Sequence, residues 1–294
     1  MSPDPFSALH TQHERLFGAN RFVYPVLSRR SGGISVGINL NPDKVCNFDC
    51  VYCQVNRVSQ SETRFVDTPQ LLAELRGTLE LATSGRLFTL GKFRDTPPTQ
   101  RRLADIAFSG DGEPTTHRNF DEVVAACAEL KRQLQLDTLP LVLITNASMF
   151  HRDHIRRALH TLDANHGEIW AKLDAGTAAY YQRVNRAPFG FSQILQNITQ
   201  AAIVRPLVIQ SLFMRIDGQA PPQAEWLAFC DRLQEITAAG GQLKLIQIYT
   251  VARPPAESYV SPLTNDEVDQ MVAFVRDHTG LVVAGFYGAS QQTG

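Results

Sequence analysis

Cys46-Asn-Phe-Asp-Cys50-Val-Tyr-Cys53 places three of the chain's five cysteines within eight residues. Three thiolates can hold three irons of a [4Fe–4S] cube, and with no fourth cysteine nearby the last iron stays open to another ligand. In one α-helix, Cys46 and Cys53 would lie about 10 Å apart along the axis, too far for one compact cluster. The segment is therefore predicted to be a loop around a metal cluster, and the alternative is three incidental thiols. Cys127 and Cys230 stand singly in helical patterns and are expected to be core residues.

The composition is that of one large globular domain. The chain has 294 residues, of which 44% are hydrophobic and 19% charged, and a single domain over 1–294 is expected. It has no run of about 18 apolar residues that could span a bilayer. Its start, Met-Ser-Pro-Asp-Pro-Phe-Ser, lacks the basic and apolar regions of a secretory signal. We therefore expect no membrane insertion and a cytoplasmic location, where reducing conditions suit thiolate ligands.

Outside the cysteine run, the chain alternates between strand-like and helical patterns. This alternation is typical of βα units and implies an α/β fold with a parallel sheet. Six units with right-handed crossovers can curl into a partial (β/α)6 TIM-like barrel, with ligand sites at the carboxyl ends of the strands. The predicted strands are 33–39, 105–109, 141–145, 168–173, 207–213 and 243–249, with a seventh candidate at 281–286, and the predicted helices lie near 68–83, 119–135, 152–162, 190–203, 222–238 and 264–278.

The second predicted strand runs into a glycine-rich turn, SGDGEP, at 109–114. Gly110 and Gly112 would let the backbone turn tightly and approach a ligand. Asp111 and Glu113 place carboxylates beside that backbone. By itself, a G-x-G pattern is equally typical of an ordinary turn.

Polar residues also follow the third predicted strand and end the fourth. Asn146 stands where its amide could bond a ribose hydroxyl or cap a helix. On the fourth strand, Trp170, Lys172 and Asp174 alternate onto one face, and the apolar residues between them onto the other. Burying Lys172 and Asp174 is costly unless they pair or meet a ligand. They are therefore either a structural ion pair or groups that handle a substrate.

Taken in order along the chain, GINLNPDKVCNFDCVYCQ, FSGDGEPT, ITNAS, AKLDAG and VNRAP resemble the radical S-adenosylmethionine (SAM) superfamily over about residues 22–288. The resemblance is to the branch that includes the tRNA wyosine-base synthases. It implies a [4Fe–4S] cluster on Cys46, Cys50 and Cys53, with SAM bound at the open iron. It further implies that an external electron donor of the flavodoxin or ferredoxin type reduces the cluster, and that SAM is cleaved to a 5′-deoxyadenosyl radical that removes hydrogen from a substrate.

The same resemblance assigns roles to the other candidate residues. Tyr52 would pack near the adenine of SAM, and Asn146 near its ribose. Asp111 stands where the first glycine of the family's GGE-type motif would be. Lys172 and Asp174 are the candidates for substrate handling. Gly112 and Glu113 are expected near the SAM amino group, and Gly110 and Asp111 are expected to bind the cofactor from the same turn.

Two alternatives to a radical SAM enzyme on an unidentified substrate stay open. One is a base-modifying enzyme acting on tRNA, related to the wyosine synthases. Those synthases carry a second cluster whose cysteines precede the loop, whereas no cysteine precedes Cys46 here, and the net charge of −1 gives no overall basic field for RNA. The other is a non-catalytic iron–sulfur protein for electron transfer, which predicts a fourth cysteine ligand and no SAM site.

Overall fold

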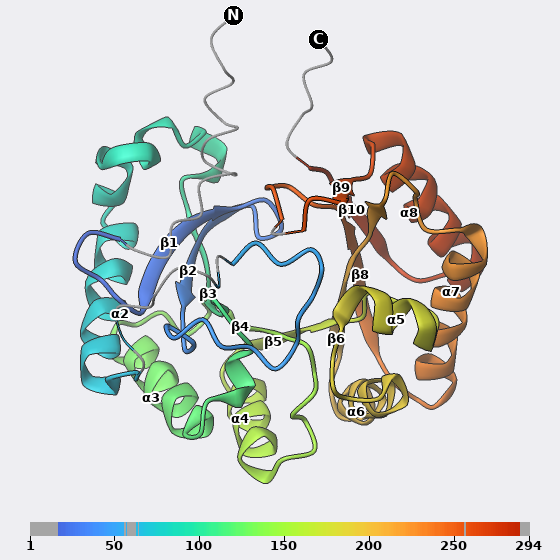
Figure 1. Cartoon of the computed structure of the whole chain (residues 1–294). Helices are drawn as coiled ribbons and strands as arrows, with labels where there is room; N and C mark the ends of the chain where they lie inside the picture. The colour runs from blue at the N-terminus through green and yellow to red at the C-terminus, as the bar shows by residue number, and fades with distance from the viewer. Residues whose placement is uncertain (1–16, 56, 58–62, 64, 256, 289–294) are drawn as a thin grey trace, which may run out of the picture. The chain divides into compact units, whose positions relative to one another are not determined.

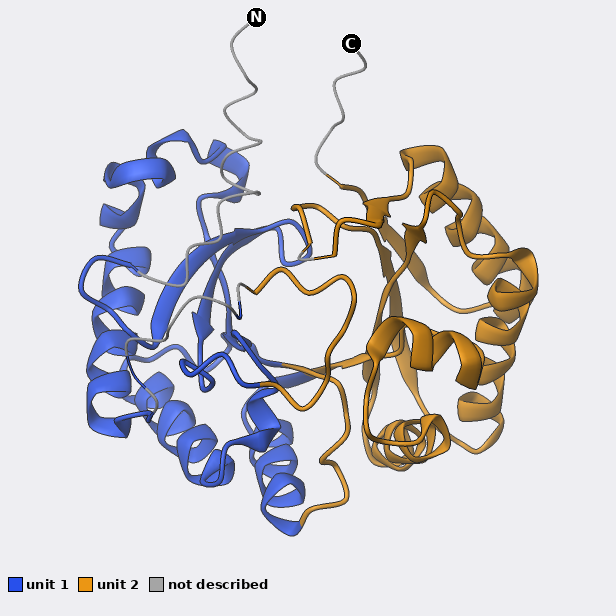
Figure 2. Cartoon of the chain, in the orientation of Figure 1, with its two compact units in different colours: residues 1–45, 57–143, 153–168 blue, residues 46–56, 144–152, 169–294 orange. Residues whose placement is uncertain are grey.

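The computed structural model describes residues 17–55, 57, 63, 65–255 and 257–288 (Figure 1). The chain divides into two compact units, coloured separately in Figure 2. Unit 1 comprises residues 1–45, 57–143 and 153–168, and unit 2 comprises 46–56, 144–152 and 169–294. None of the described helices combines the length and apolar character needed to cross a membrane. The expectation of one domain over 1–294 stays a prediction.

Unit 1 is built on strands β1 to β4, in that spatial order. β1 pairs antiparallel with β2, and β2, β3 and β4 run parallel. The chain is anchored ahead of β1 by Glu74, whose carboxylate accepts the backbone N–H groups of Arg21, Phe22 and Val23 at 2.8–3.1 Å. The elements are β1 (Val23–Ser28), β2 (Gly33–Ile38), α2 (Thr68–Thr83), η1 (Arg86–Thr89), η2 (Gly91–Asp95), η3 (Pro98–Gln100), β3 (Leu103–Phe108), η4 (Pro114–Thr116), α3 (Phe120–Gln133), β4 (Leu141–Thr145, its last two residues in unit 2) and α4 (Asp153–Asp163).

Unit 2 is built on the parallel strands β5, β6, β8 and β10, in that spatial order. A short antiparallel ribbon of β7 and β9 extends it. The last helix begins with a capping box, in which Thr264 and Glu267 satisfy each other's backbone N–H groups. The elements are β5 (Gly167–Lys172, its first two residues in unit 1), α5 (Ala178–Asn185), α6 (Phe191–Val204), β6 (Leu207–Leu212), β7 (Met214–Ile216), α7 (Gln223–Ala238), β8 (Leu243–Tyr249), β9 (Val260–Pro262), α8 (Asn265–Thr279) and β10 (Val283–Phe286).

The alternation of strands and helices predicted from the sequence is confirmed. Every predicted helix and strand, the seventh strand included, is present with bounds that differ by at most two residues. Strand β1, helix α5, the β7–β9 ribbon and the short 3-10 helices η1 to η4 were not predicted. Pro25 lies inside β1, and a proline in a strand is tolerated at a sheet edge; β1 pairs with β2 alone among the described strands.

Candidate functional site

The cysteine run forms an irregular loop with a single turn and no helix, as predicted. The turn is closed by Cys53 N, which donates to Cys50 O at 2.9 Å. Cys46, Cys50 and Cys53 are each half-buried, and none of the chain's five cysteines, all within the described residues, forms a disulfide. The loop therefore carries three half-buried cysteines.

The described residues bring no three His, Cys, Asp or Glu side chains together as around a single metal ion. A [4Fe–4S] cube does not require such convergence, because each cysteine binds a different iron of the cube. Three thiols on an irregular loop are the donor set that such a cluster takes. The residues present thus fit a three-cysteine cluster in kind and in number.

The middle of the loop is tied to the last turn of α5. Val51 N donates to Val184 O at 2.9 Å, and Asp49 N donates to Asn185 O at 3.2 Å. Arg186, which ends α5 in the left-handed conformation with φ 45°, donates from Nε to Asp49 O at 2.9 Å. These backbone bonds fix the loop between its first and second cysteines and just beyond.

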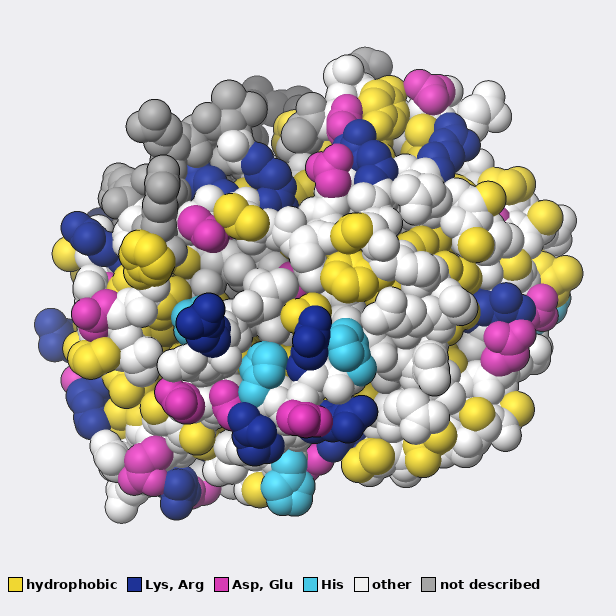
Figure 3. Space-filling model, turned by 60° about the horizontal axis from the view of Figure 1, so that its bottom comes forward, with side chains coloured by type: hydrophobic (Ala, Val, Ile, Leu, Met, Phe, Trp, Pro, Cys, Tyr) yellow, Lys and Arg dark blue, Asp and Glu magenta, His cyan; other side chains and the backbone are white. Residues whose placement is uncertain are grey.

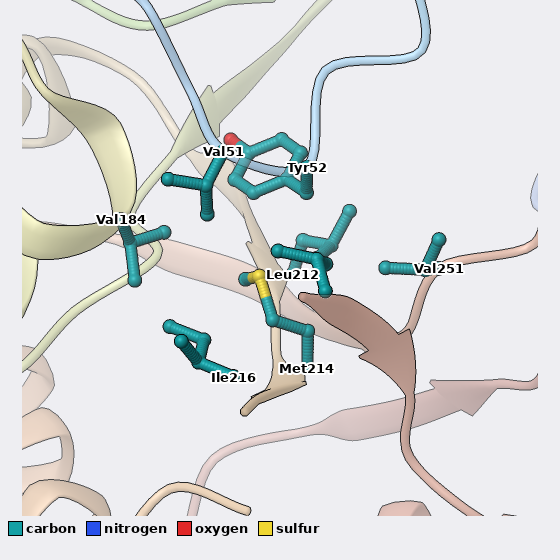
Figure 4. Close-up of a cluster of buried hydrophobic side chains, with 8 residues drawn as sticks. Val51, Tyr52, Val184, Leu212, Met214, Ile216 and Val251 are labelled. Atoms are coloured by element: carbon teal, nitrogen blue, oxygen red, sulfur yellow. The ribbon is translucent and has the colours of Figure 1, made fainter. Parts of the chain in front are cut away.

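Apolar side chains anchor the same segment from below (Figure 4). Val51 and Tyr52 are 2% and 8% exposed, and both belong to one buried hydrophobic cluster. A strand would turn the second of two consecutive side chains to the opposite face, whereas the irregular backbone of the loop directs both into the same cluster. The other members of the cluster are Val184, Leu212, Met214, Ile216, Val251 and Val260.

The carboxylate of Asp174 lies at the centre of a buried polar network. Its Oδ2 atom accepts the Tyr52 hydroxyl at 2.5 Å and Asn185 Nδ2 at 3.1 Å. Its Oδ1 atom accepts Leu212 N at 2.9 Å and lies 3.2 Å from Lys172 Nζ. Because an ionised carboxylate has about four acceptor sites, the protein fills all of them. Asp174 thereby connects the cluster loop, the end of α5 and the end of β6.

Lys172 is the more exposed partner of this ion pair, with 17% of its side chain exposed against 1% for Asp174. Its Nζ atom donates to the Tyr249 hydroxyl at 2.8 Å and lies over the rings of Tyr52 and Tyr249, 4.9 and 5.3 Å from their centroids. Burial alone would lower the pKa of Lys172, but the Asp174 charge and Tyr249 outweigh it and raise that pKa. Lys172 is thus a cation at neutral pH, and the predicted pairing of the two residues is present.

Cys50 borders this network. Asn185 Nδ2 donates to Cys50 Sγ at 3.5 Å. Burial, and then the nearby Asp174 charge, raise the pKa of Cys50 to about 12, whereas hydrogen bonding with Asn185 and Tyr52 and the charge of Lys172 act against the increase. A cysteine ligand binds as thiolate, so metal binding at Cys50 must release a proton.

Asn146, predicted to meet a ribose or to cap a helix, is bonded to the cluster loop. Its Nδ2 atom donates to Asn47 Oδ1 at 2.8 Å, and Asn47 Nδ2 donates in turn to Ser148 Oγ at 2.8 Å. Asn146 Oδ1 accepts Ser148 N at 3.0 Å. The amide therefore orients the residue that follows Cys46, and the predicted ribose contact stays a prediction.

The glycine-rich turn lies in unit 1, at the carboxyl end of β3, as predicted. Asn39 Nδ2 donates to Asp111 Oδ2 at 2.7 Å, and Asp111 N donates to Asn39 Oδ1 at 3.1 Å. Glu113 Oε1 accepts Thr115 N at 3.1 Å and its hydroxyl at 2.5 Å, and so caps η4. Both carboxylates are buried and have protein partners.

The two glycines of this turn serve close packing rather than a left-handed backbone. Neither Gly110 nor Gly112 has a positive φ. A Cβ at Gly110 would collide with the Asn39 side chain, and one at Gly112 with the carbonyl of Val45. The close backbone approach expected from the sequence is thus present, and the neighbours in contact are Asn39 and Val45.

The structure thus groups the predicted residues of unit 2 around the cluster loop and those of unit 1 around the β3 turn. Asn47 and Asn185 were not assigned from the sequence. Asn185 lies in VNRAP, one of the stretches that carry the family resemblance. That resemblance was the only sequence feature that could have identified Asn185 as a site residue. Its partners Cys50 and Asp174 are 135 and 11 residues away, and no local pattern indicates the contact with Cys50.

Comparison with known proteins supports the fold. No protein-family model matches the sequence. The UPF0026 protein of Methanocaldococcus jannaschii is 25% identical over 264 residues, covering 87% of this chain and 71% of that protein. A Brachyspira hyodysenteriae protein named GTPase Obg is 25% identical over 176 residues, covering 59% of this chain, which spans only 21% of that protein.

Among solved structures, a mutant of spore photoproduct lyase has a TM-score of 0.56 and 10% identity, covering 92% of this chain and 80% of the other. This likeness shows the fold. The α/β class with a partial (β/α)6 TIM-like barrel is therefore confirmed.

Proposed function

We propose that this chain is a radical SAM enzyme that holds one [4Fe–4S] cluster on Cys46, Cys50 and Cys53. When bound, the cluster and SAM supply, after reduction by a flavodoxin- or ferredoxin-type donor, a 5′-deoxyadenosyl radical that removes hydrogen from a substrate. The observation that carries the proposal is the cysteine loop, which is irregular, partly exposed and fixed by α5 and by the core of unit 2. The carboxyl ends of the strands are the usual location for ligands in barrels of this class.

The chain's own residues position the ligands and orient the substrate. Asp174 and Tyr52 hold the loop, because both are buried and bonded to each other. Lys172 is a partly exposed cation beside Tyr249 and is the better candidate for binding a polar or anionic substrate group. Stacking of Tyr52 near adenine stays a prediction, as does the binding of SAM by Gly110, Asp111, Gly112 and Glu113.

The alternatives remain distinguishable. A tRNA-modifying enzyme would need a surface that attracts the phosphate backbone. A non-catalytic electron-transfer protein would carry the cluster without binding SAM. The GTPase name of the Brachyspira relative is not carried over, because the sequence contains no G-x-x-x-x-G-K-[S/T] motif for phosphate binding. Under this proposal the protein works in the cytoplasm, because reducing conditions keep the cysteine ligands as free thiolates.

Cluster loading tests the three-cysteine assignment. Anaerobic reconstitution should give about four iron per chain, since one cube is expected. Replacing Cys46, Cys50 and Cys53 together by Ala should abolish the visible absorption. Cys230→Ala is the matched control, because Cys230 is buried in α7, outside the cysteine run, and its loss should leave the iron content unchanged. An intact cluster in the triple variant would overturn the assignment.

Turnover of SAM separates the enzyme from the electron-transfer alternative. With dithionite and SAM, the reconstituted wild type should form 5′-deoxyadenosine slowly even without substrate, and SAM should change the EPR spectrum of the reduced cluster. The triple cysteine variant is the blank. A reduced cluster with an EPR spectrum insensitive to SAM and no deoxyadenosine would favour a non-catalytic iron–sulfur protein.

A further inference from the structure

We propose that Asn185 is a positioning residue whose side-chain amide donates a hydrogen bond to the sulfur of Cys50 and thereby makes the bound cluster easier to reduce. The inference rests on the proposed function, because it takes Cys50 as an iron ligand. Asn185 is the last residue of α5 and touches the loop through both its backbone and its side chain.

The geometry gives each hydrogen of the amide its own acceptor. Asn185 Nδ2 lies 3.5 Å from Cys50 Sγ and 3.1 Å from Asp174 Oδ2. A primary amide has two donor hydrogens, which these two acceptors use. Both acceptors carry negative charge when the carboxylate is ionised and the thiol is a ligand. Bonds of an N–H donor to charged acceptors are stronger than neutral ones.

The fold holds this amide in place from several directions. The main-chain carbonyl of Asn185 accepts Asp49 N, so its backbone is tied to the loop. Its acceptor Asp174 is itself fixed by the Tyr52 hydroxyl and by Leu212 N. Because the backbone of Asn185 and the acceptor of its side chain are both fixed, the binding of a ligand to the loop does not require the Asn185 side chain to lose further conformational freedom.

Packing alone does not explain an amide at this position. Asn185 is 2% exposed, and its Oδ1 atom is buried without a hydrogen-bond partner in the described part of the chain. An unsatisfied buried acceptor is destabilising, and a leucine of similar size would fill the volume without it. The benefit must therefore lie in the N–H side of the amide, which reaches Cys50 and Asp174.

The direction of the effect follows from charge. Reduction adds one electron to the cluster and increases the negative charge on its sulfur ligands. A donor aimed at Cys50 Sγ stabilises that charge, so it stabilises the reduced state more than the oxidised state, and hydrogen bonds to the sulfurs are among the factors that set cluster potentials. Removing the donor should make reduction harder.

The test is a redox titration of reconstituted full-length protein without SAM, followed by EPR. Asn185→Leu should lower the ratio of reduced to oxidised cluster at a fixed solution potential by up to about tenfold, which for one electron corresponds to about 59 mV. Asn165→Leu is the matched control, since Asn165 belongs to unit 1, whereas the cysteine loop belongs to unit 2, and it donates its amide to Thr161 O at 2.8 Å. Its ratio should equal that of the wild type.

The outcomes separate this inference from the proposed function. If the wild type takes up no cluster, the proposed function fails. If wild type and Asn185→Leu both load about four iron and titrate together, the inference is overturned and the function stands. If Asn185→Leu does not fold, a measurement on the wild type tests the inference instead. Pulsed EPR of the reduced cluster, with 15N in asparagine side chains, should show coupling to an amide nitrogen, and its absence would overturn the inference.

Discussion

Asp174 is stable as a buried charge because every acceptor site on its carboxylate has a donor. An isolated carboxylate in the interior is costly, and pairing offsets the cost only when hydrogen bonds complete the coordination. Here Tyr52, Asn185, Leu212 N and Lys172 supply them, at 2.5 to 3.2 Å. A carboxylate with this many protein partners has no acceptor left for a substrate. These contacts favour the structural alternative for Asp174, and a role in substrate handling stays a prediction for both Asp174 and Lys172.

We expect the two members of the ion pair to differ in their effect on stability. Asp174→Ala leaves Lys172 without its counter-charge and Leu212 N without an acceptor, so the free energy of unfolding of the cluster-free protein should fall by about 3–5 kcal/mol. Lys172→Met should cost less, because three donors remain on Asp174 and the lysine is partly exposed. Urea unfolding followed by circular dichroism measures both.

Two other outcomes for this pair would contradict the role given to Asp174. If Asp174→Ala unfolds like the wild type, keeps its iron and loses only product formation with the natural substrate, then Asp174 contacts substrate and its assignment as an anchor of the loop is wrong. Equal destabilisation by both substitutions would instead mean that the ion pair with Lys172 accounts for the stabilisation by Asp174, and that the other three donors contribute little.

Sequence pattern could predict some of these residues and not others. Three cysteines within eight residues are a local signal, and strand alternation predicted that Lys172 and Asp174 share a face. The Tyr52–Asp174 bond joins positions 122 residues apart, and the Leu212 contact uses a backbone N–H that every residue has. Such contacts depend on how the loop and strand ends come together in the folded unit, which no local pattern contains.

At the scale of elements, α5 is the support on which the cluster loop rests. It has only eight residues, so its stability must come from its neighbours rather than from helix propensity. Thr177 caps its start by accepting Tyr180 N at 3.1 Å. Glu225 of α7 accepts Gly176 N at 2.5 Å and Thr177 N at 3.1 Å. The buried Glu225 therefore links α7 to the loop through α5.

Removing that carboxylate should loosen the loop as well as destabilise the unit. Glu225→Leu leaves two backbone N–H groups without an acceptor, at about 1–3 kcal/mol each, so the free energy of unfolding should fall by about 2–6 kcal/mol. Hydrogen exchange measured by mass spectrometry should show faster exchange at the amides of Asp49 and Val51, which bond to the end of α5.

Glu235→Leu is the control on the same helix, because Glu235 is exposed and pairs with Arg232 on the surface. It should change stability by no more than about 0.5 kcal/mol and leave exchange in the loop unchanged. Unaltered protection of Asp49 and Val51 in Glu225→Leu would show that α5 does not need Glu225 to hold the loop.

The elements differ in how well the sequence predicted them. Long segments with clear helical or strand periodicity were predicted to within two residues, because their buried faces repeat over several turns or residues. Helix α5 has little more than two turns, too few to establish a period. Strand β1 contains Pro25, which argues against a strand everywhere except at an edge. The formation of α5 and of β1 thus depends on their tertiary neighbours.

At the scale of the whole molecule, the numbers of basic and acidic residues are balanced. The chain has 28 basic and 29 acidic residues, and basic and acidic side chains are interspersed on the face drawn in Figure 3. Several cations are paired locally, as in Arg157 with Asp121 at 2.7 Å and Arg215 with Glu267 at 2.6 Å. Paired charges of both signs give a weak net field, and a nucleic acid is attracted by the field of unpaired cations.

We therefore expect weak binding of bulk tRNA. By fluorescence anisotropy with unmodified tRNA in 150 mM KCl, the reconstituted protein should show a Kd no tighter than the range of about 10⁻⁶ to 10⁻⁴ M typical of non-specific binding. Few phosphate contacts also predict a shallow dependence of log Kd on log salt concentration. Binding much tighter than micromolar with a steep salt dependence would contradict this expectation. It would favour the tRNA-modifying alternative, because tight binding that depends on salt requires several Lys or Arg side chains to neutralise phosphates together.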